Sequence, residues 1–218
     1  MVIHQPPPDL ALAAPARRSP RGRGDAGRIA ARRRILDAAR TLFAERGFAA
    51  TRVADVARRA GMSPGNVYRH VDSKEAVLRA ILGEGLDGLE ATIVEVADGY
   101  GPARRKLELL IDRTIAFHAA NPELAIVLGS LAGDVGAEAL AGLDLEARAE
   151  RRHAGLRRIF AEARTEGAIA PGDPDVLAAL HAAFFSGLLV AFRARWTDLP
   201  WDAIRAAALR LVGHRPAG

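Results

Sequence analysis

The short segment 63–70 contains the side chains with the clearest capacity to recognise another molecule. Asn66 and Arg69 lie three residues apart. Each can form paired hydrogen bonds with a nucleobase, the amide with the edge of adenine and the guanidinium with the edge of guanine. Ser63 can cap a helix that has Pro64 at its first position. A short helix beginning here would carry both polar side chains outward, and we expect them to read base edges.

A preceding helix must hold this segment against the duplex. Apolar spacing predicts a helix over residues 51–60, which Thr51 caps and Gly61 ends. Ala57 and Ala60 are small enough to let the short helix approach closely. A helix, a three-residue turn and a second short helix have the spacing of a helix-turn-helix, whose second helix enters the major groove of DNA.

The distribution of charge supports a nucleic-acid partner for the N-terminal third. Residues 15–80 contain 16 Lys and Arg against 6 Asp and Glu, whereas residues 81–218 contain 15 against 19. The net charge of the whole chain is +5. A basic segment joined to a mildly acidic remainder is typical of a nucleic-acid-binding module attached to a different module.

Residues 34–82 resemble the DNA-binding domain of TetR-family repressors. One position departs from the pattern, since His70 is followed by Val71 where many members have an aromatic residue. Most of the family's core pattern is intact, so this departure puts little in doubt. The residues that carry the resemblance are Ala38-Ala39, Leu42-Phe43, Gly47-Phe48, Thr51, Val53, Val56-Ala57, Ala60-Gly61, Ser63, Tyr68, His70 and Ser73-Lys74-Glu75.

The resemblance implies two kinds of DNA contact. Thr51 and Arg52 would touch phosphate at the start of the second helix, and Tyr68 and Lys74 would bind phosphate as well. The residues nearest the base edges would lie on the short helix. The predicted DNA-binding set is Thr51, Arg52, Ser63, Pro64, Gly65, Asn66, Tyr68, Arg69, His70 and Lys74.

Simpler interpretations of some of these residues stay open. Tyr68 could pack in the core, and His70 could serve packing and hydrogen bonding in place of a DNA contact. Arg52 and Arg69 could belong to an ordinary solvated face, although the regional excess of positive charge argues against that.

Three later helices each direct one histidine to their apolar face: His118, His153 and His181. They could be three separate core histidines with partners, polar contacts in a ligand pocket, or a shared metal site. The inward faces carry no carboxylate, which disfavours a metal or a cationic ligand. The predicted effector-binding set is Phe117, His118, His153, Leu156, Phe160, His181, Phe184 and Leu188.

No motif indicates an enzyme or a cofactor. The chain has no cysteine, and two GxGxxG strings, at 22–27 and 83–88, lack the preceding strand of a dinucleotide site. The second string lies in a helix, where three glycines predict a pliable link between two parts of the chain. We expect no catalytic residue, no metal and no cofactor.

The predicted fold is all-α. A disordered basic tail (1–27), which could also reach DNA as an arm, precedes a three-helix DNA-binding domain (28–82) and a larger helical effector and dimerisation domain (83–218). Helices are expected at about 27–46, 51–60, 63–70, 72–82, 102–120, 122 onward, 145–166, 174–196 and 200–212, the fourth capped by Asp72 with Glu75.

These observations favour a transcriptional repressor that binds a palindromic operator as a homodimer and is released by a small molecule. The resemblance implies that the last two long helices form the dimer interface, and the wide apolar face of the late helix points the same way. The alternatives are a DNA-binding interaction protein without an effector, and an enzyme with a borrowed DNA-binding domain. The longest apolar run, residues 178–192, is too short for a membrane span, and we expect a cytoplasmic protein.

Overall fold

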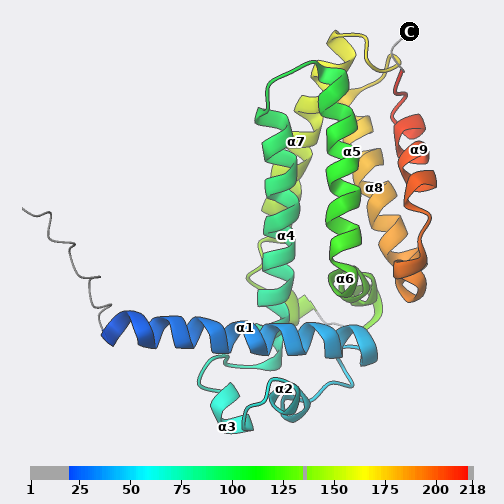
Figure 1. Cartoon of the computed structure of the whole chain (residues 1–218). Coiled ribbons are helices and arrows are strands. Elements are labelled where there is room, and N and C mark those ends of the chain that lie inside the picture. The colour runs from blue at the N-terminus through cyan, green and yellow to red at the C-terminus, as the bar shows by residue number, and fades with distance from the viewer. Residues whose placement is uncertain (1–19, 135–136, 216–218) are drawn as a thin grey trace, which may run out of the picture.

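The computed structural model describes residues 20–134 and 137–215, and within them the chain forms nine α-helices. Figure 1 shows two parts: α1 lies across the foot of an upright helical bundle, and α2 and α3 lie beyond α1, on the side away from the bundle. The only β pairing among the described residues is an isolated bridge between Ile169 and His214. The predicted all-α class is confirmed.

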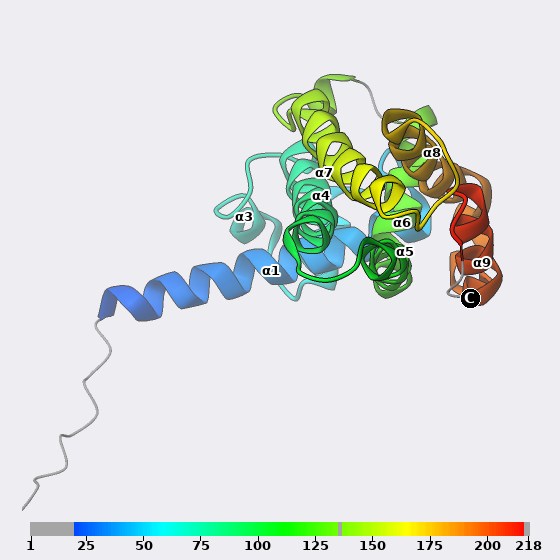
Figure 2. The same ribbon diagram turned by 90° about the horizontal axis from the view of Figure 1, so that it is seen from above.

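The N-terminal part consists of α1 (Pro20–Arg46), α2 (Val53–Arg59) and α3 (Pro64–Val67). The helix begins at Pro20, so the expected disorder of residues 20–27 is wrong, and residues 1–19 lie outside the described part. The first half of α1 extends beyond the rest of the molecule (Figure 2), and residues 25–30 are exposed. An ion pair between Arg28 and Asp25, at 2.9 Å, joins adjacent turns of this extension.

Helix α4 (Lys74–Asp98) runs without a break from the N-terminal part into the bundle. Its N-cap is Ser73, whose hydroxyl accepts a hydrogen bond from the backbone N–H of Ala76 at 3.1 Å, so the predicted capping by Asp72 is wrong. The helix crosses the expected boundary at residues 82–83. It carries buried side chains at both ends, Leu78 and Ile81 in one core and Ile93 and Val96 in the other.

The glycines of α4 permit close packing and do not break the helix. A Cβ at residue 85 would lie 2.3 Å from Leu124 Cδ2, and one at residue 88 would lie 2.8 Å from Phe117 Cε2. Both distances are shorter than side chains tolerate, so Gly85 and Gly88 let the neighbouring helices approach α4. The prediction that these glycines make a pliable link between the two parts of the chain is therefore wrong, because this stretch of α4 is tightly packed against α5 and α6.

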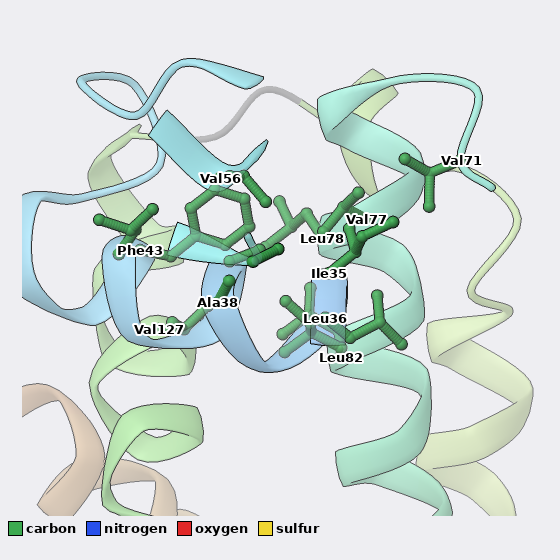
Figure 3. Close-up of a cluster of buried hydrophobic side chains, with 14 of the residues drawn as sticks. Ile35, Leu36, Ala38, Phe43, Val56, Val71, Val77, Leu78, Leu82 and Val127 are labelled. Carbon is green, nitrogen blue, oxygen red and sulfur yellow. The ribbon is translucent and has the colours of Figure 1, made fainter. Parts of the chain in front are cut away.

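The N-terminal core joins α1, α2, α3 and the start of α4. Phe43, Ile35 and Leu78 are almost fully buried there (Figure 3). Val127 and Leu124 enter the same core from α6, a helix of the bundle. The two parts of the molecule therefore share a continuous apolar contact.

The bundle contains α5 (Ala103–Ala120), α6 (Pro122–Asp134), α7 (Leu145–Thr165), α8 (Pro174–Phe192) and α9 (Trp201–Leu211). Two short 3₁₀ helices, Ala137–Leu140 and Arg193–Asp198, connect them. These bounds lie close to the predicted ones, except that α8 ends at Phe192 and not near Trp196. Gly167 ends α7 with a positive φ of 68°, as expected for a helix terminated by glycine.

Candidate functional site

Helix α3 has the local structure predicted for a reading helix. The Ser63 hydroxyl accepts a hydrogen bond from the backbone N–H of Asn66 at 3.3 Å, and Pro64 occupies the first turn. Val67, on the opposite face, is buried in the N-terminal core. This anchoring leaves Ser63, Pro64, Gly65 and Arg69 exposed and Asn66 half-buried. Helix α3 itself lies on the side of the molecule away from the bundle (Figure 1).

Thr51 has a different position from the one predicted. Its side chain is 1% exposed, and its hydroxyl hydrogen-bonds to the backbone oxygens of Gly47 and Leu42 at 2.8 and 3.3 Å. The N-cap of α2 is Arg52, whose backbone N–H donates to Asp55. Thr51 therefore closes the loop between α1 and α2 from inside, and its hydroxyl is not presented on the surface.

The ammonium group of Lys74 is also engaged inside the domain. It donates to the backbone oxygens of Phe48 at 2.9 Å, Thr51 at 3.1 Å and Ala49 at 3.5 Å. The same atom lies 4.2 Å from the centroid of the Phe48 ring. Lys74 thus ties the start of α4 to the loop that ends α1, a role that the sequence did not predict.

The remaining predicted contacts differ in exposure. Tyr68 is 55% exposed at the end of α3, which removes the alternative of a core tyrosine. Arg52 and Arg69 are exposed, and neither forms an ion pair with any described residue. His70 is half-buried, and its buried Nδ1 has no hydrogen-bond partner among the described residues. Arg52 and Arg69 therefore place two positive charges without ion-pair partners in the described chain close to α3 in sequence.

A cavity of about 740 Å³ lies among α4, α5, α6, α7 and α8. Its walls are mainly apolar, and it includes five of the eight predicted effector residues: Phe117, His118, His153, Leu156 and His181. The other three lie elsewhere. Phe160 is buried in the bundle core, and Phe184 and Leu188 turn toward the cluster around Trp196 and α9.

Two of the three histidines form one inner wall of this cavity. His118 and His181 are each 4% exposed, and both rings pack on Phe185, with centroid distances of 5.6 and 4.9 Å. Burial lowers the pKa of His118 to about 4. Burial, reinforced by the nearby His118, lowers the pKa of His181 to about 4 as well. Both imidazoles are therefore neutral at pH 7, each with one donor and one acceptor nitrogen.

His153 lies at the rim of the cavity and not on the inner wall. Its side chain is 39% exposed, and its Nε2 is 3.0 Å from Asp175 Oδ1. The described residues contain no group of three or more His, Cys, Asp or Glu side chains placed to hold a metal ion. The interpretation of the histidines as a shared metal site thus has no support in this part of the chain.

Sequence reasoning missed two polar side chains that line the cavity. Thr114 is 2% exposed, and its Oγ1 has no hydrogen-bond partner among the described residues. Arg152 is half-buried at the rim, with one buried guanidinium nitrogen that also lacks a partner there. Thr114 could have been found, because it lies one turn before His118 on the apolar face of α5. Nothing in the charged sequence of α7 distinguishes Arg152 from its neighbours.

Helix α8 exposes a continuous apolar face on the outside of the bundle. Val176, Leu180 and Val190 are 55%, 39% and 59% exposed, and Ala183 and Gly187 lie exposed between them. This helix is long and apolar enough to cross a membrane by length and composition, but a single helix of this kind is weak evidence, because core helices of soluble proteins pass the same test. A face of this size on a helical bundle favours a protein partner.

Comparison with known proteins agrees with this geometry. Residues 35–81 match the family described as bacterial regulatory proteins, tetR family. The HTH-type transcriptional repressor KstR2 of Rhodococcus jostii is 40% identical over 101 residues, which is 46% of this chain and 50% of the relative. The aligned region thus spans about half the length of that relative.

Solved structures match nearly the whole chain. A regulatory protein in the tetR family from Rhodococcus RHA1 has a TM-score of 0.69 and 27% identity, covering 85% of this chain and 98% of that one. AibR, in a structure with isovaleryl coenzyme A and operator DNA, has a TM-score of 0.68 over 85% of this chain and 100% of its own. The two sequences are 22% identical, and at this level the structural similarity shows a shared fold alone.

The fold and the exposed short helix define a helix-turn-helix protein with a helical companion domain. Residues 35–81 match the tetR family of bacterial regulatory proteins, and most of the chain shares the fold of a solved tetR-family protein.

Proposed function

We propose that the protein is a transcriptional repressor that binds double-stranded DNA through α3. The observation that carries this proposal is the anchored helix α3, which buries Val67 and leaves Asn66 and Arg69 available to base edges. Arg52 and Tyr68 flank the helix and are free to contact phosphate. The role is regulatory and not catalytic, and the site of action is the cytoplasm.

Two copies of α3 are needed to read a palindromic operator. The exposed apolar face of α8, from Val176 to Val190, is the surface we assign to the homodimer, together with α9; Val190 also lines the cavity, so this face borders the cavity. Small residues at 183 and 187 would let two copies of α8 approach closely. The two α3 helices would then enter successive major grooves, roughly 34 to 36 Å apart.

The cavity is the proposed effector site. It is lined by five helices, is mainly apolar and carries a few polar groups, which is the usual character of a small-molecule site. AibR, which shares the fold, has been crystallised with both an acyl coenzyme A and operator DNA. An effector bound in the cavity of this protein would make it a repressor that releases DNA when the ligand binds.

Two cavity residues provide the physical link to the DNA-binding part. Phe117 and Leu128 line the cavity, and both also pack against the N-terminal core. A ligand that displaces either side chain would shift α6 or α4 against α1, because Gly85 and Gly88 leave no spare room at that contact. The ligand would stabilise the arrangement of helices in which it fits. If that arrangement sets a different distance between the two α3 helices of the dimer, operator affinity changes.

Footprinting on the DNA upstream of the protein's own gene tests the proposal. We expect protection of an inverted repeat by the parent protein and about a tenfold or greater loss of affinity for Arg69→Ala, since one bidentate base contact is worth about 1–3 kcal/mol. Glu146→Ala, far along the chain on exposed α7, is the control and should bind like the parent. Absence of protection would overturn the assignment of α3 to DNA. Protection that no small molecule relieves would leave a DNA-binding protein without an effector.

A further inference from the structure

The inner end of the cavity presents polar groups that carry no charge. Thr114 lies one helical turn before His118 on α5, and His181 faces them from α8 against the shared Phe185 ring. A helical threonine commonly returns its hydroxyl to a carbonyl of the preceding turn, but Thr114 Oγ1 has no partner among the described residues. No hydrogen bond to a ring nitrogen of His118 or His181 occurs in the described ranges either. Three donor and acceptor groups are thus available to a ligand.

No permanent charge reaches this inner end. The cavity residues of α4, α5, α6 and α8 are apolar, small, hydroxyl-bearing or one of the two neutral histidines. The ionisable cavity residues outside this pair come from α7 and lie toward the rim: Glu150, Arg152, His153 and Arg157. A neutral oxygen would therefore be favoured at the inner end, where a carboxylate would find no opposing charge.

Arg152 is the basic group best placed to meet an anion at the rim. The neighbouring arginines of α7 are already paired, Arg148 with Asp87 at 2.5 Å and Arg151 with Glu90 at 2.6 Å. Arg157 lies 3.7 Å from Asp175, and Glu150 is exposed to solvent. Arg152 is half-buried, its pKa is lowered by burial, and one of its nitrogens is buried without a partner in the described chain. An anion beside it would compensate its desolvated charge.

We propose that the cavity binds an amphiphile with an apolar body, a neutral hydroxyl or carbonyl oxygen held by Thr114, His118 and His181, and an anionic group held by Arg152. This inference rests on the proposed function of the cavity as the effector site and narrows it to a chemical class. The inner polar groups select an oxygenated molecule over a plain hydrocarbon chain of the same length. Arg152 selects an acid over a neutral molecule.

Calorimetric titration of the full-length protein with three series of probes of 8 to 16 carbons tests the class. The series are ω-hydroxy fatty acids, plain fatty acids and α,ω-diols. We expect the best ω-hydroxy acid to bind about tenfold more tightly than the plain acid and than the diol of equal length, the value of about one additional hydrogen bond. Binding of the plain acid as tightly as the hydroxy acid at every length, or no binding at all, would overturn the proposal.

Two substitutions separate the ends of the ligand. Thr114→Val should reduce the preference for the hydroxyl without lowering the melting temperature, because the hydroxyl it removes has no partner among the described residues. Arg152→Met should weaken both acids about tenfold and leave the diol unchanged. Thr92→Val is the matched control: the Thr92 hydroxyl donates to Gly88 O at 2.9 Å and lies outside the cavity lining, so this variant should keep the parental preference. Parental selectivity in Thr114→Val would contradict the assignment of the inner end.

The same titrations distinguish this inference from the proposed function. Binding of the hydroxy acid without any change in DNA affinity would support the ligand class and overturn the coupling of cavity to operator. Operator binding that responds to other molecules, together with no binding of these probes, would overturn the class alone.

Discussion

Replacement of Lys74 by methionine tests the role that the structure gives this residue. Methionine keeps the apolar stem but removes the ammonium group, which donates to the backbone oxygens of Phe48 and Thr51 at 2.9 and 3.1 Å. It also removes the cation 4.2 Å from the Phe48 ring. A hydrogen bond to a charged group contributes roughly 1.5–3 kcal/mol, and partial exposure reduces that value. We expect a loss of about 2 kcal/mol in the free energy of unfolding.

A loss of that size would lower the melting temperature by about 4–8 °C in a protein of this length. Thermal unfolding followed by circular dichroism measures it, and Arg69→Met is the control, since Arg69 is exposed and has no ion pair in the described chain. The control should change the melting temperature by less than 2 °C. If Lys74→Met unfolds at the parental temperature, the ammonium group does not hold the loop, and Lys74 is left with the phosphate contact implied by the family resemblance.

Three further substitutions or conditions test the packing and the interface. Gly85→Ala should lower the free energy of unfolding by about 1–3 kcal/mol in a urea titration, because the added methyl group overlaps the Leu124 side chain of α6. Gly27→Ala is the control: its methyl group meets open space, so the substitution should be neutral or stabilising. As the pH falls from 6.5 to 4, His118 and His181 become protonated in the unfolded chain but not in the folded chain, so the free energy of unfolding should decrease by up to roughly 3 kcal/mol per histidine. The decrease should be less steep in His181→Leu, and parallel pH profiles for the parent and this variant would refute the burial argument. Leu180→Glu should convert the dimer to a monomer in light scattering, and a parent protein that is monomeric at micromolar concentration would contradict the assigned interface.

The helix-turn-helix could be predicted because its determinants are local. The cap at Ser63, the proline that follows it and the glycine at 61 specify the turn and the start of α3 within a few residues. The caps of α2 and α4 were misassigned for a related reason. Asp72 and Ser73 are adjacent residues of similar capping ability, and the sequence does not show which of them caps α4. Thr51 is a better capping residue than Arg52, and only tertiary packing decides that Thr51 turns inward to Gly47 O.

The cavity could be predicted only in part. Apolar periodicity correctly directs His118 and His181 inward, but it does not show which neighbouring helix each face meets. Phe184 and Phe185 are adjacent in sequence, and the rotation of α8 alone decides that Phe185 faces the cavity and Phe184 faces α9. The glycines of α4 show the same limit of sequence-based prediction. Helix propensity predicts that they weaken the helix, whereas in the structure they allow the neighbouring helices to approach α4 closely.

Selection of binding sites from a random pool of double-stranded DNA tests the central claim most directly. The parent protein should enrich an inverted repeat whose half-sites are one helical turn, roughly 34 to 36 Å, or a multiple of a turn apart. Arg69→Ala should enrich a repeat with a relaxed preference at one base pair of each half-site, because a single side chain on α3 has been removed. Enrichment of no sequence by the parent, or of the unchanged parental consensus by both Arg69→Ala and Asn66→Ala, would contradict the conclusion that α3 reads DNA.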